Sequence, residues 1–287
     1  MKHNKIIHIL FMGFLVLALC APGIAKKKKE IMIESQWAQN PVRIDGMNDD
    51  WANSIFNSEK KVKVDYAFMN DAQNLYILFI FKKPTTRYIS SIDFTGMKIL
   101  FSPEGKKVKD YGIRFIVKKI SADEYIALLE KEIGPASEAK KEQIRVNPAY
   151  VLYGHEMISK ESSEGLKLMG PVFRSKRQQG TFIYEFSIPL EKLAELSSEI
   201  GAEPGKSIQV GFEWGGMTAE IKKALAARIG DGIAKAQDQK AGGLTSERRA
   251  GSGLGDVESS RSRLEQMRRM RPKKHSFWVS LKLAQSK

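Results

Sequence analysis

Residues 62–81 read VKVDYAFMNDAQNLYILFIF, and this stretch decides the fold. In its first half, Lys63 and Asp65 alternate with apolar side chains, which is the period of two expected of a strand with one face in water. The second half is apolar on both faces, which indicates a strand in the middle of a sheet. Residues 70–73 supply the short polar side chains that favour a turn. The stretch therefore predicts a β-hairpin whose second arm is central.

The same alternation predicts further strands on both sides of this hairpin. These cover residues 31–34, 97–101, 111–117, 150–153, 182–188, 208–214 and 277–283. Short helices are predicted at 123–133, 190–196 and 218–236, and the charged stretch 136–142 is expected to be solvated. Many strands with one apolar face, separated by turns and only short helices, indicate an all-β fold. We predict a two-sheet antiparallel β-sandwich with a long basic insertion before its last strand.

Residues 1–25 have the pattern of an export signal. Lysines precede an apolar run at 6–21 that is too short for a membrane span, and small residues follow it. We predict cleavage after Ala25, which would make the protein periplasmic or secreted. A lipid anchor on Cys20 is the less favoured alternative, because the bulky Leu19 stands directly before it.

Cleavage there would remove the one cysteine of the chain, and residues 26–287 would form a single domain without a thiol. Disulfides, thiolate metal sites and a thiol nucleophile are then excluded. His155 and His275 remain, and neither lies in a metal-ligand spacing. The best carboxylate pair, Glu185 with Glu213, is drawn from 33 acidic residues and carries little information. We therefore predict that the protein is not an enzyme.

Half of the formal net charge of +14 lies in one segment. Residues 217–275 contain 14 Lys or Arg against 7 Asp or Glu, and they contain no aromatic residue. The stacking platform of single-strand nucleic-acid binders is missing from this segment, so we predict no nucleic-acid partner. We interpret the segment as an insertion into the sandwich, with a mobile loop at 242–271.

Five motifs occur in the order found in one family of β-sandwiches. They are IDGMNDDW at 44–51, DAQNLYILF at 71–79, MKILFSPEG at 97–105, YEFSIPLEKL at 184–193 and WVSLKLA at 278–284. Together they resemble the family 9 carbohydrate-binding-module-like domains, which are relatives of the DOMON sandwiches. The resemblance implies a sandwich that in some relatives grips a sugar end between two Trp faces, often with structural calcium. In other relatives it implies a site for haem b.

Sugar recognition needs flat aromatic faces together with amides or carboxylates that bond the hydroxyl groups. Trp37 and Trp278 fall on or near the face opposite the core residues, and they are the first candidates. Trp214 and Glu213 are further candidates, although Trp214 shares the apolar face of its strand. Trp51 is expected to plug the end of the core.

Asp45, Asp49 and Asp50 place hard oxygen ligands close together near a glycine turn. Such ligands suit calcium, so these three residues are the candidate metal site. A solvated turn without metal is the alternative interpretation.

We therefore predict an exported, non-catalytic protein that binds a glycan or small sugar through exposed aromatic side chains. One alternative is an envelope interaction protein whose basic loop, 242–274, contacts anionic polymer or lipid head groups. The other is a haem b electron-transfer subunit, which needs an axial ligand such as Met69, Met97 or Met217.

Overall fold

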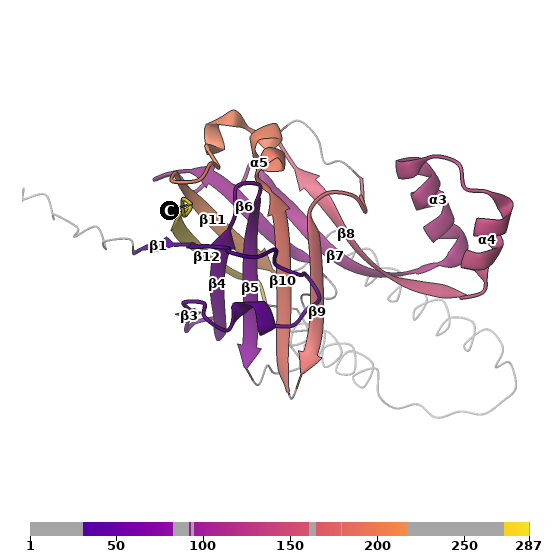
Figure 1. Ribbon diagram of the computed structural model, residues 1–287, viewed down its shortest axis with the longest axis horizontal. Helices are drawn as coiled ribbons and strands as arrows, with labels where there is room; N and C mark the ends of the chain where they lie inside the picture. The colour runs from indigo at the N-terminus through magenta and orange to yellow at the C-terminus, as the bar shows by residue number, and fades with distance from the viewer. Residues whose placement is uncertain are drawn as a thin grey trace, which may run out of the picture. The chain divides into compact units, whose positions relative to one another are not determined.

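The computed structural model describes residues 31–82, 92, 95–160, 165–178, 180–216 and 273–286. Within this part of the chain, two β-sheets pack face to face and only short helices accompany them (Figure 1). The predicted β-sandwich is confirmed. The export signal at 1–25, the helix at 218–236 and the loop at 242–271 lie outside the described residues.

The first sheet has six strands in the order β1–β12–β11–β6–β7–β8. Their bounds are β1 Met32–Glu34, β12 His275–Lys282, β11 Ser207–Trp214, β6 Met97–Pro103, β7 Gly112–Ser121 and β8 Ala149–Ile158. Neighbours are antiparallel except β1 and β12, which are parallel. The predicted last strand thus pairs back into the sheet.

The second sheet has the order β2–β4–β5–β10–β9, and β3 also pairs with β4. The bounds are β2 Gln36–Trp37, β3 Asn57–Glu59, β4 Val64–Asn70, β5 Asn74–Lys82, β9 Val172–Gln178 and β10 Thr181–Pro189. The quoted stretch forms β4 and β5, and β5 lies between β4 and β10, central as predicted. β2 runs parallel to β4, so the sandwich is mixed at two edges rather than wholly antiparallel.

The helices are α3 Ala122–Ile133, α4 Glu138–Arg145 and α5 Leu190–Leu196, with 3-10 turns η1 Asp49–Trp51 and η2 Ser198–Ile200. α3 begins with a capping box between Ser121 and Glu124. α4 was expected to be solvated and is largely exposed, but it is helical. Among the described residues, no helix is both long enough and apolar enough to cross a membrane.

The main core lies between the sheets and is rich in aromatic rings. Phe79 of β5 meets Phe212 of β11 edge to face, with ring centroids 4.7 Å apart. β5 and β10 contribute seven buried side chains to this core: Leu75, Ile77, Phe79, Phe81, Tyr184, Phe186 and Ile188. These are the residues that the period of two assigned to one face.

A second apolar cluster lies on the outward face of the second sheet. It contains Trp51, Ala67, Met69, Tyr76, Leu78, Ile80 and Ile183. The expectation that β4 keeps this face in water is wrong beyond Asp65, because the segment 38–51 lies over it (Figure 1). Trp51 is fully buried here, so it does plug a core, although a smaller one than expected.

The Glu185 carboxylate holds this segment in place. It is fully buried; its Oε1 accepts a hydrogen bond from Trp51 Nε1 at 2.8 Å, and its Oε2 accepts from the backbone N–H of Gly46 at 2.7 Å and Asp45 at 3.0 Å. Burial raises the pKa of Glu185, and the three donors oppose this effect without cancelling it. A Cβ on Gly46, whose φ is +81°, would lie 2.9 Å from the backbone of Ser175. The Glu185 carboxylate therefore joins the motif IDGMNDDW at 44–51 to the motif YEFSIPLEKL at 184–193.

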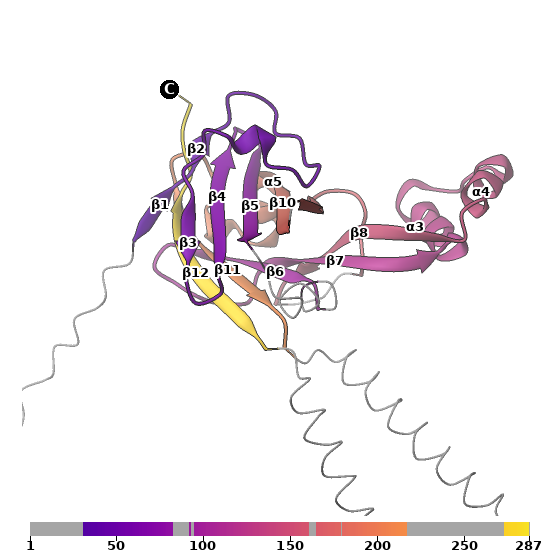
Figure 2. The same cartoon turned by 90° about the horizontal axis from the view of Figure 1, so that it is seen from below.

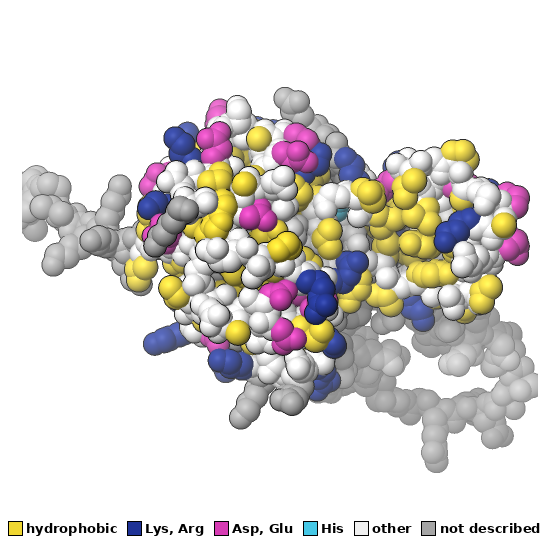
Figure 3. All heavy atoms as spheres, in the orientation of Figure 1, with side chains coloured by type: hydrophobic (Ala, Val, Ile, Leu, Met, Phe, Trp, Pro, Cys, Tyr) yellow, Lys and Arg dark blue, Asp and Glu magenta, His cyan; other side chains and the backbone are white. Residues whose placement is uncertain are grey.

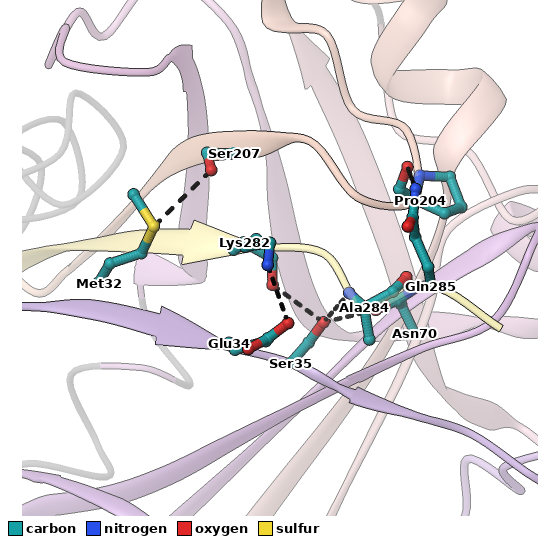
Figure 4. A network of polar contacts seen from close by, with 9 residues as sticks. All are labelled: Met32, Glu34, Ser35, Asn70, Pro204, Ser207, Lys282, Ala284 and Gln285. Atoms are coloured by element: carbon teal, nitrogen blue, oxygen red, sulfur yellow. Dashed lines mark hydrogen bonds and ion pairs between the residues drawn. The ribbon is translucent and has the colours of Figure 1, made fainter. Parts of the chain in front are cut away.

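A buried asparagine ties the two sheets together at one edge (Figure 4). Asn70 of β4 donates to the carbonyl of Ala284 at 3.0 Å and accepts from its N–H at 2.8 Å. Ser35, where the chain passes from β1 to β2, donates its hydroxyl to the same Asn70 oxygen, and its N–H donates to Lys282 at 2.9 Å. The end of β12 is thereby fixed to the other sheet.

We expect Asn70→Ala to lower the free energy of unfolding by about 2–4 kcal/mol, because it removes a buried side chain and leaves the carbonyl of Ala284 without its donor, although the Ala284 N–H still donates to the Ser35 hydroxyl at 2.9 Å. Urea unfolding measures the change. Asn40→Ala, at an exposed position, is the matched control and should change stability by less than about 0.5 kcal/mol. If both substitutions change the free energy of unfolding equally, the hydrogen bonds of Asn70 contribute nothing to stability.

Glu185→Gln should destabilise the protein by about 1–3 kcal/mol at acidic pH, since an amide cannot accept all three bonds. A raised native pKa means that the folded state binds the proton more tightly than the unfolded state. Wild-type stability from this group is therefore lost as pH rises from the ordinary value of 4.5 through the raised pKa. The stability difference between wild type and variant should shrink over that range in urea unfolding. A difference that grows with pH would show that the donors outweigh burial.

Candidate functional site

Trp214, predicted as a ligand candidate, lies in the main core. It is 1% exposed, and its ring stacks on His275 at 5.4 Å and meets Phe81 edge to face at 5.9 Å. Its indole nitrogen has no hydrogen-bond partner within the part of the chain that the structure describes. A ring without an exposed face cannot cover a sugar. Trp214 is therefore a core residue, in agreement with its position on the apolar face of its strand.

Trp278 and Glu213 lie on the outward face of the first sheet. Trp278 is half-buried against Gly211, where a Cβ would come within 2.8 Å of three atoms of the indole ring. Glu213 binds Lys109 Nζ at 2.6 Å and Lys274 Nζ at 2.8 Å. Burial alone would raise the pKa of Glu213, but the two ammonium groups more than offset it and hold the pKa below its ordinary value. This carboxylate is already occupied by two cations.

Trp37 lies elsewhere, on the edge strand β2 of the second sheet. It is half-buried and pairs with Asn70. Trp37 and Trp278 therefore belong to different sheets, and neither lines the hollows described below. The fold does not bring these two rings together around one groove.

Two of the three aspartates predicted to bind calcium make contacts within their own turn. Asp45 accepts from the Met47 N–H at 2.9 Å and pairs with Arg43 Nε at 2.8 Å. Asp50 accepts from the Arg43 N–H at 2.9 Å, and Asp49 is exposed. Over the described ranges, no three or more His, Cys, Asp or Glu side chains converge as metal ligands. Calcium at this turn stays a prediction.

The remaining candidates for chemistry are dispersed. Glu185 and Glu213 lie on the outward faces of opposite sheets with the main core between them, so they cannot act as a pair across one glycosidic bond. Met97 lies in the main core and Met69 in the smaller cluster. Met217 falls outside the described residues.

A pocket of about 410 Å³ opens beside β8, where the chain after β8, the segment 165–171 and α5 meet. Its lining combines a few apolar side chains with many polar ones. They are Tyr111, His155, Met157, Ser159, Lys160, Lys167, Met169, Pro171, Lys192, Glu195 and Leu196. This lining is more polar than that of most small-molecule sites, which are predominantly apolar.

The wall of the pocket is fixed by backbone pairing. His155 of β8 is buried, and it exchanges two backbone hydrogen bonds with Lys167, at 3.0 and 2.8 Å. A Cβ on Gly154 would lie 2.7 Å from the Leu166 side chain, so glycine permits this close approach. Residues 165–171 therefore pack against β8 and close one side of the pocket.

Ion pairs and a cation–π contact hold the charged side chains at the rim of the pocket. Lys160 lies over the Tyr111 ring, with Nζ 5.6 Å from the centroid, and pairs with Asp110 at 3.5 Å. Lys192 donates to both oxygens of Glu195, at 2.7 and 2.8 Å. Three ammonium groups thus line the pocket, and one of its lining residues is a carboxylate.

A second hollow of about 310 Å³, which we call the tyrosine groove, shares Met169 and Pro171 with the pocket. Tyr125 of α3 and Tyr150 of β8 stack there at 4.7 Å, and the Arg174 guanidinium lies 5.0 Å from the centre of the ring of Tyr153. The groove is lined by Tyr125, Leu129, Ile133, Tyr150, Val151, Leu152, Tyr153, Leu168, Met169, Pro171, Val172 and Arg174. Figure 3 shows apolar side chains gathered over the part of the molecule that carries α3 and α4.

Two features create this groove. Residues 116–121 of β7 pair with β8 beyond the last residue that is paired to β6, and this two-stranded extension carries α3 and α4 (Figure 2). Glu132 of α3 accepts from the N–H groups of Leu168 and Met169 at 2.7 and 3.0 Å. The segment between pocket and groove is therefore anchored to the helix.

The positions of the tryptophans do not predict these hollows, which are lined by tyrosines instead. Tyr125 has the spacing of a helix core residue, whereas Tyr150 and Tyr153 are three residues apart and therefore point to opposite faces of the predicted strand. The period of a strand or helix shows which face is apolar. It does not show that this part of β8 extends past the region where the two sheets cover each other. Four tyrosines between 111 and 153 were the available signal.

A scan of protein-family models finds no match to this chain, and a search of curated proteins finds none. Among solved structures, it is similar to a family 9 carbohydrate-binding module from Caldicellulosiruptor kristjanssonii in complex with glucose. The identity is 13% and the TM-score 0.32, over 67% of this chain and 81% of that chain. A family 9 module from the same organism in complex with cellotriose gives 13% and 0.31, over 67% and 80%. These values are too low to assign the family or a ligand.

Proposed function

We propose that this protein binds carbohydrate without chemically altering it, in the pocket beside β8 and along the adjoining tyrosine groove. The observation that carries the proposal is that the two hollows adjoin at Met169 and Pro171, one rich in polar groups and the other in aromatic rings. The predicted export signal agrees with a ligand found outside the cytoplasm.

The pocket has the chemistry that one sugar ring requires. A pyranose has apolar C–H faces and a rim of hydroxyl groups, so it needs both aromatic or aliphatic surface and hydrogen-bonding groups. Tyr111, Met157 and Leu196 supply the aromatic and aliphatic surface. Ser159 and the lysines supply hydrogen-bond donors for the hydroxyl groups of the sugar. About 410 Å³ is within the range of small-molecule pockets.

The tyrosine groove is suited to further sugar units of the same ligand. Its rings and aliphatic side chains offer apolar surface, while the tyrosine hydroxyls and Arg174 offer polar contacts. Met169 is 65% exposed and Val151 is 62% exposed, so both present apolar surface at the groove. A saccharide chain leaving the pocket over Met169 would cover this surface.

Binding rather than cleavage follows from the carboxylates. Glycoside hydrolysis ordinarily needs two carboxyl groups across the bond, one of which acts as a general acid. Among the described residues that line the pocket, Glu195 is the one carboxylate, and both of its oxygens are bonded to Lys192. The pocket therefore supplies contacts but not the acid and base pair.

Ser159→Trp should fill the pocket and reduce glycan affinity by about tenfold or more, through lost contacts and steric conflict. Ser276→Trp is the matched control: this serine is exposed on the outward face of the first sheet, two residues from Trp278. A glycan array of neutral and acidic saccharides identifies ligands for wild type, and isothermal titration calorimetry compares the variants. If only Ser276→Trp abolishes binding, the site is the Trp278 face instead. A wild-type protein that binds no saccharide overturns the proposal.

Tyr125→Ala should weaken binding of an oligosaccharide by about three- to tenfold, as expected for loss of one aromatic contact. Affinity for a monosaccharide should not change, because Tyr125 lines the groove and not the pocket. Val146→Ala, at a 77% exposed residue outside both, serves as the control. Calorimetry with ligands of increasing length measures the effect. An equal loss for short and long ligands would contradict the assignment of the groove.

A further inference from the structure

We infer that the bound glycan continues beyond the tyrosine groove into a third hollow, between α3 and α4; this inference rests on the proposed function. The hollow has a volume of about 480 Å³. Tyr125, Leu129 and Tyr150 line both this hollow and the groove, whereas none of its described lining residues belongs to the pocket beside β8. The groove therefore connects the pocket with the third hollow. A ligand that fills all three is a linear saccharide chain and not a single sugar.

The Tyr125 and Tyr150 rings lie where the groove and the third hollow meet, and their positions are fixed. The rings stack 4.7 Å apart with an interplanar angle of 19°. The Tyr150 hydroxyl donates to the carbonyl of Ile144 at 2.6 Å, and it accepts from Asn147 Nδ2 at 3.4 Å. Both rings are half-buried, so part of each stays open to a ligand. An aromatic surface that is already ordered loses little conformational freedom on binding.

The two helices that border the third hollow are carried by the β7–β8 extension (Figure 2). On α3, Tyr125 and Leu129 are four residues apart and lie on one face. The Ser137 hydroxyl caps the start of α4. Ile144 of α4 belongs to the same small buried cluster as Ile126 of α3. The two sides of the hollow are therefore held together by packing between the helices.

Amide side chains supply the polar contacts of the third hollow. Gln143 of α4 accepts from Lys140 Nζ at 3.2 Å through its Oε1, and Asn147 uses its Nδ2 to bond Tyr150. Over the ranges that the structure describes, Gln143 Nε2 and Asn147 Oδ1 make no hydrogen bond. These atoms are a donor and an acceptor suited to the hydroxyl groups of a sugar. Amides beside aromatic rings are the combination that a sugar ring requires.

The same lining disfavours an apolar partner such as the face of a helix. Five of the eight lining side chains end in a polar group: Tyr125, Lys140, Gln143, Asn147 and Tyr150. An apolar partner would take these groups out of water without replacing their hydrogen bonds, which costs free energy. A chain rich in hydroxyl groups replaces those bonds.

The test is isothermal titration calorimetry on the full chain with cello-, xylo-, manno- and chito-oligosaccharides of increasing length. We expect the affinity to keep rising for ligands longer than those that Tyr125→Ala first affects, because the added units enter the third hollow. Gln143→Ala and Asn147→Ala should each weaken binding of the longest ligands by about two- to tenfold, as expected for loss of one hydrogen bond. Shorter ligands, which end in the groove, should bind both variants as they bind wild type.

Gln73→Ala and Asn40→Ala are the matched controls, because both residues are exposed and line none of the three hollows. Val146 lines the third hollow, so Val146→Ala is a control for ligands that end in the groove and not for longer ones. Gln143→Ala leaves the bonds of the Tyr150 hydroxyl intact. It therefore separates the loss of a ligand contact from a disturbance of the aromatic pair.

The outcomes separate this inference from the proposed function. If the affinity stops rising at the length that Tyr125→Ala first affects, and Gln143→Ala and Asn147→Ala are silent at every length, the third hollow is overturned while the pocket and the groove stand. Equal losses for short and long ligands also overturn it, because they show an effect on the fold. If no oligosaccharide of these series and no saccharide of the glycan array binds, the proposed function and this inference fail together.

Discussion

The buried carboxylate of Glu185 is the interaction on which the second sheet depends. It collects three donors from the segment 38–51 and so keeps that segment over β4, β5 and β10. Without this cover, Leu78, Ile80 and other apolar side chains of the outward face would meet water. The motif IDGMNDDW thus has a structural explanation here: Gly46 permits the backbone to approach β9, and Trp51 fills the cluster. Because this face is occupied by the chain itself, a ligand needs another surface.

That surface arises where the two sheets stop covering each other. β7 and β8 continue past β6 as a two-stranded extension, and α3 packs against them through a small cluster of its own. Glu132 then connects α3 to the segment 165–171, which also pairs with His155 of β8. One short segment therefore forms a wall of the pocket on one side and of the tyrosine groove on the other. The position of the hollows follows from unequal strand lengths, a property that appears only when strands are paired.

Residue patterns predicted the strands that face a core on at least one side, and this includes the central position of β5. They failed for β9, whose sequence VFRSKRQ is mostly polar because most of its side chains after Phe173 are exposed. They failed for the outward face of β4, since alternation cannot reveal that a distant segment covers Ala67 and Met69. The residue patterns predicted the candidate site least well. Tryptophans suited to sugar stacking turned out to be packed in the core, or placed on different sheets. The residues that do converge come from four separate stretches, and no local period relates them.

Ion pairing differs between the two surfaces that could bind a sugar. On the outward face of the first sheet, charges meet their counterparts: Glu213 holds Lys109 and Lys274, and Arg114 pairs with Glu156 at 3.1 Å. A ligand beside Trp278 would therefore have to disrupt ion pairs that already satisfy each other. At the pocket beside β8, Lys160 and Lys192 also have carboxylate partners, but the contact of Lys160 with Asp110 is 3.5 Å long and the Lys160 side chain is 61% exposed. Because ion pairs between exposed groups contribute little to stability, a polar group of a ligand can replace the Asp110 contact at little cost to the fold. The two surfaces therefore differ in how firmly their charged groups are held, and the looser pairing favours the pocket.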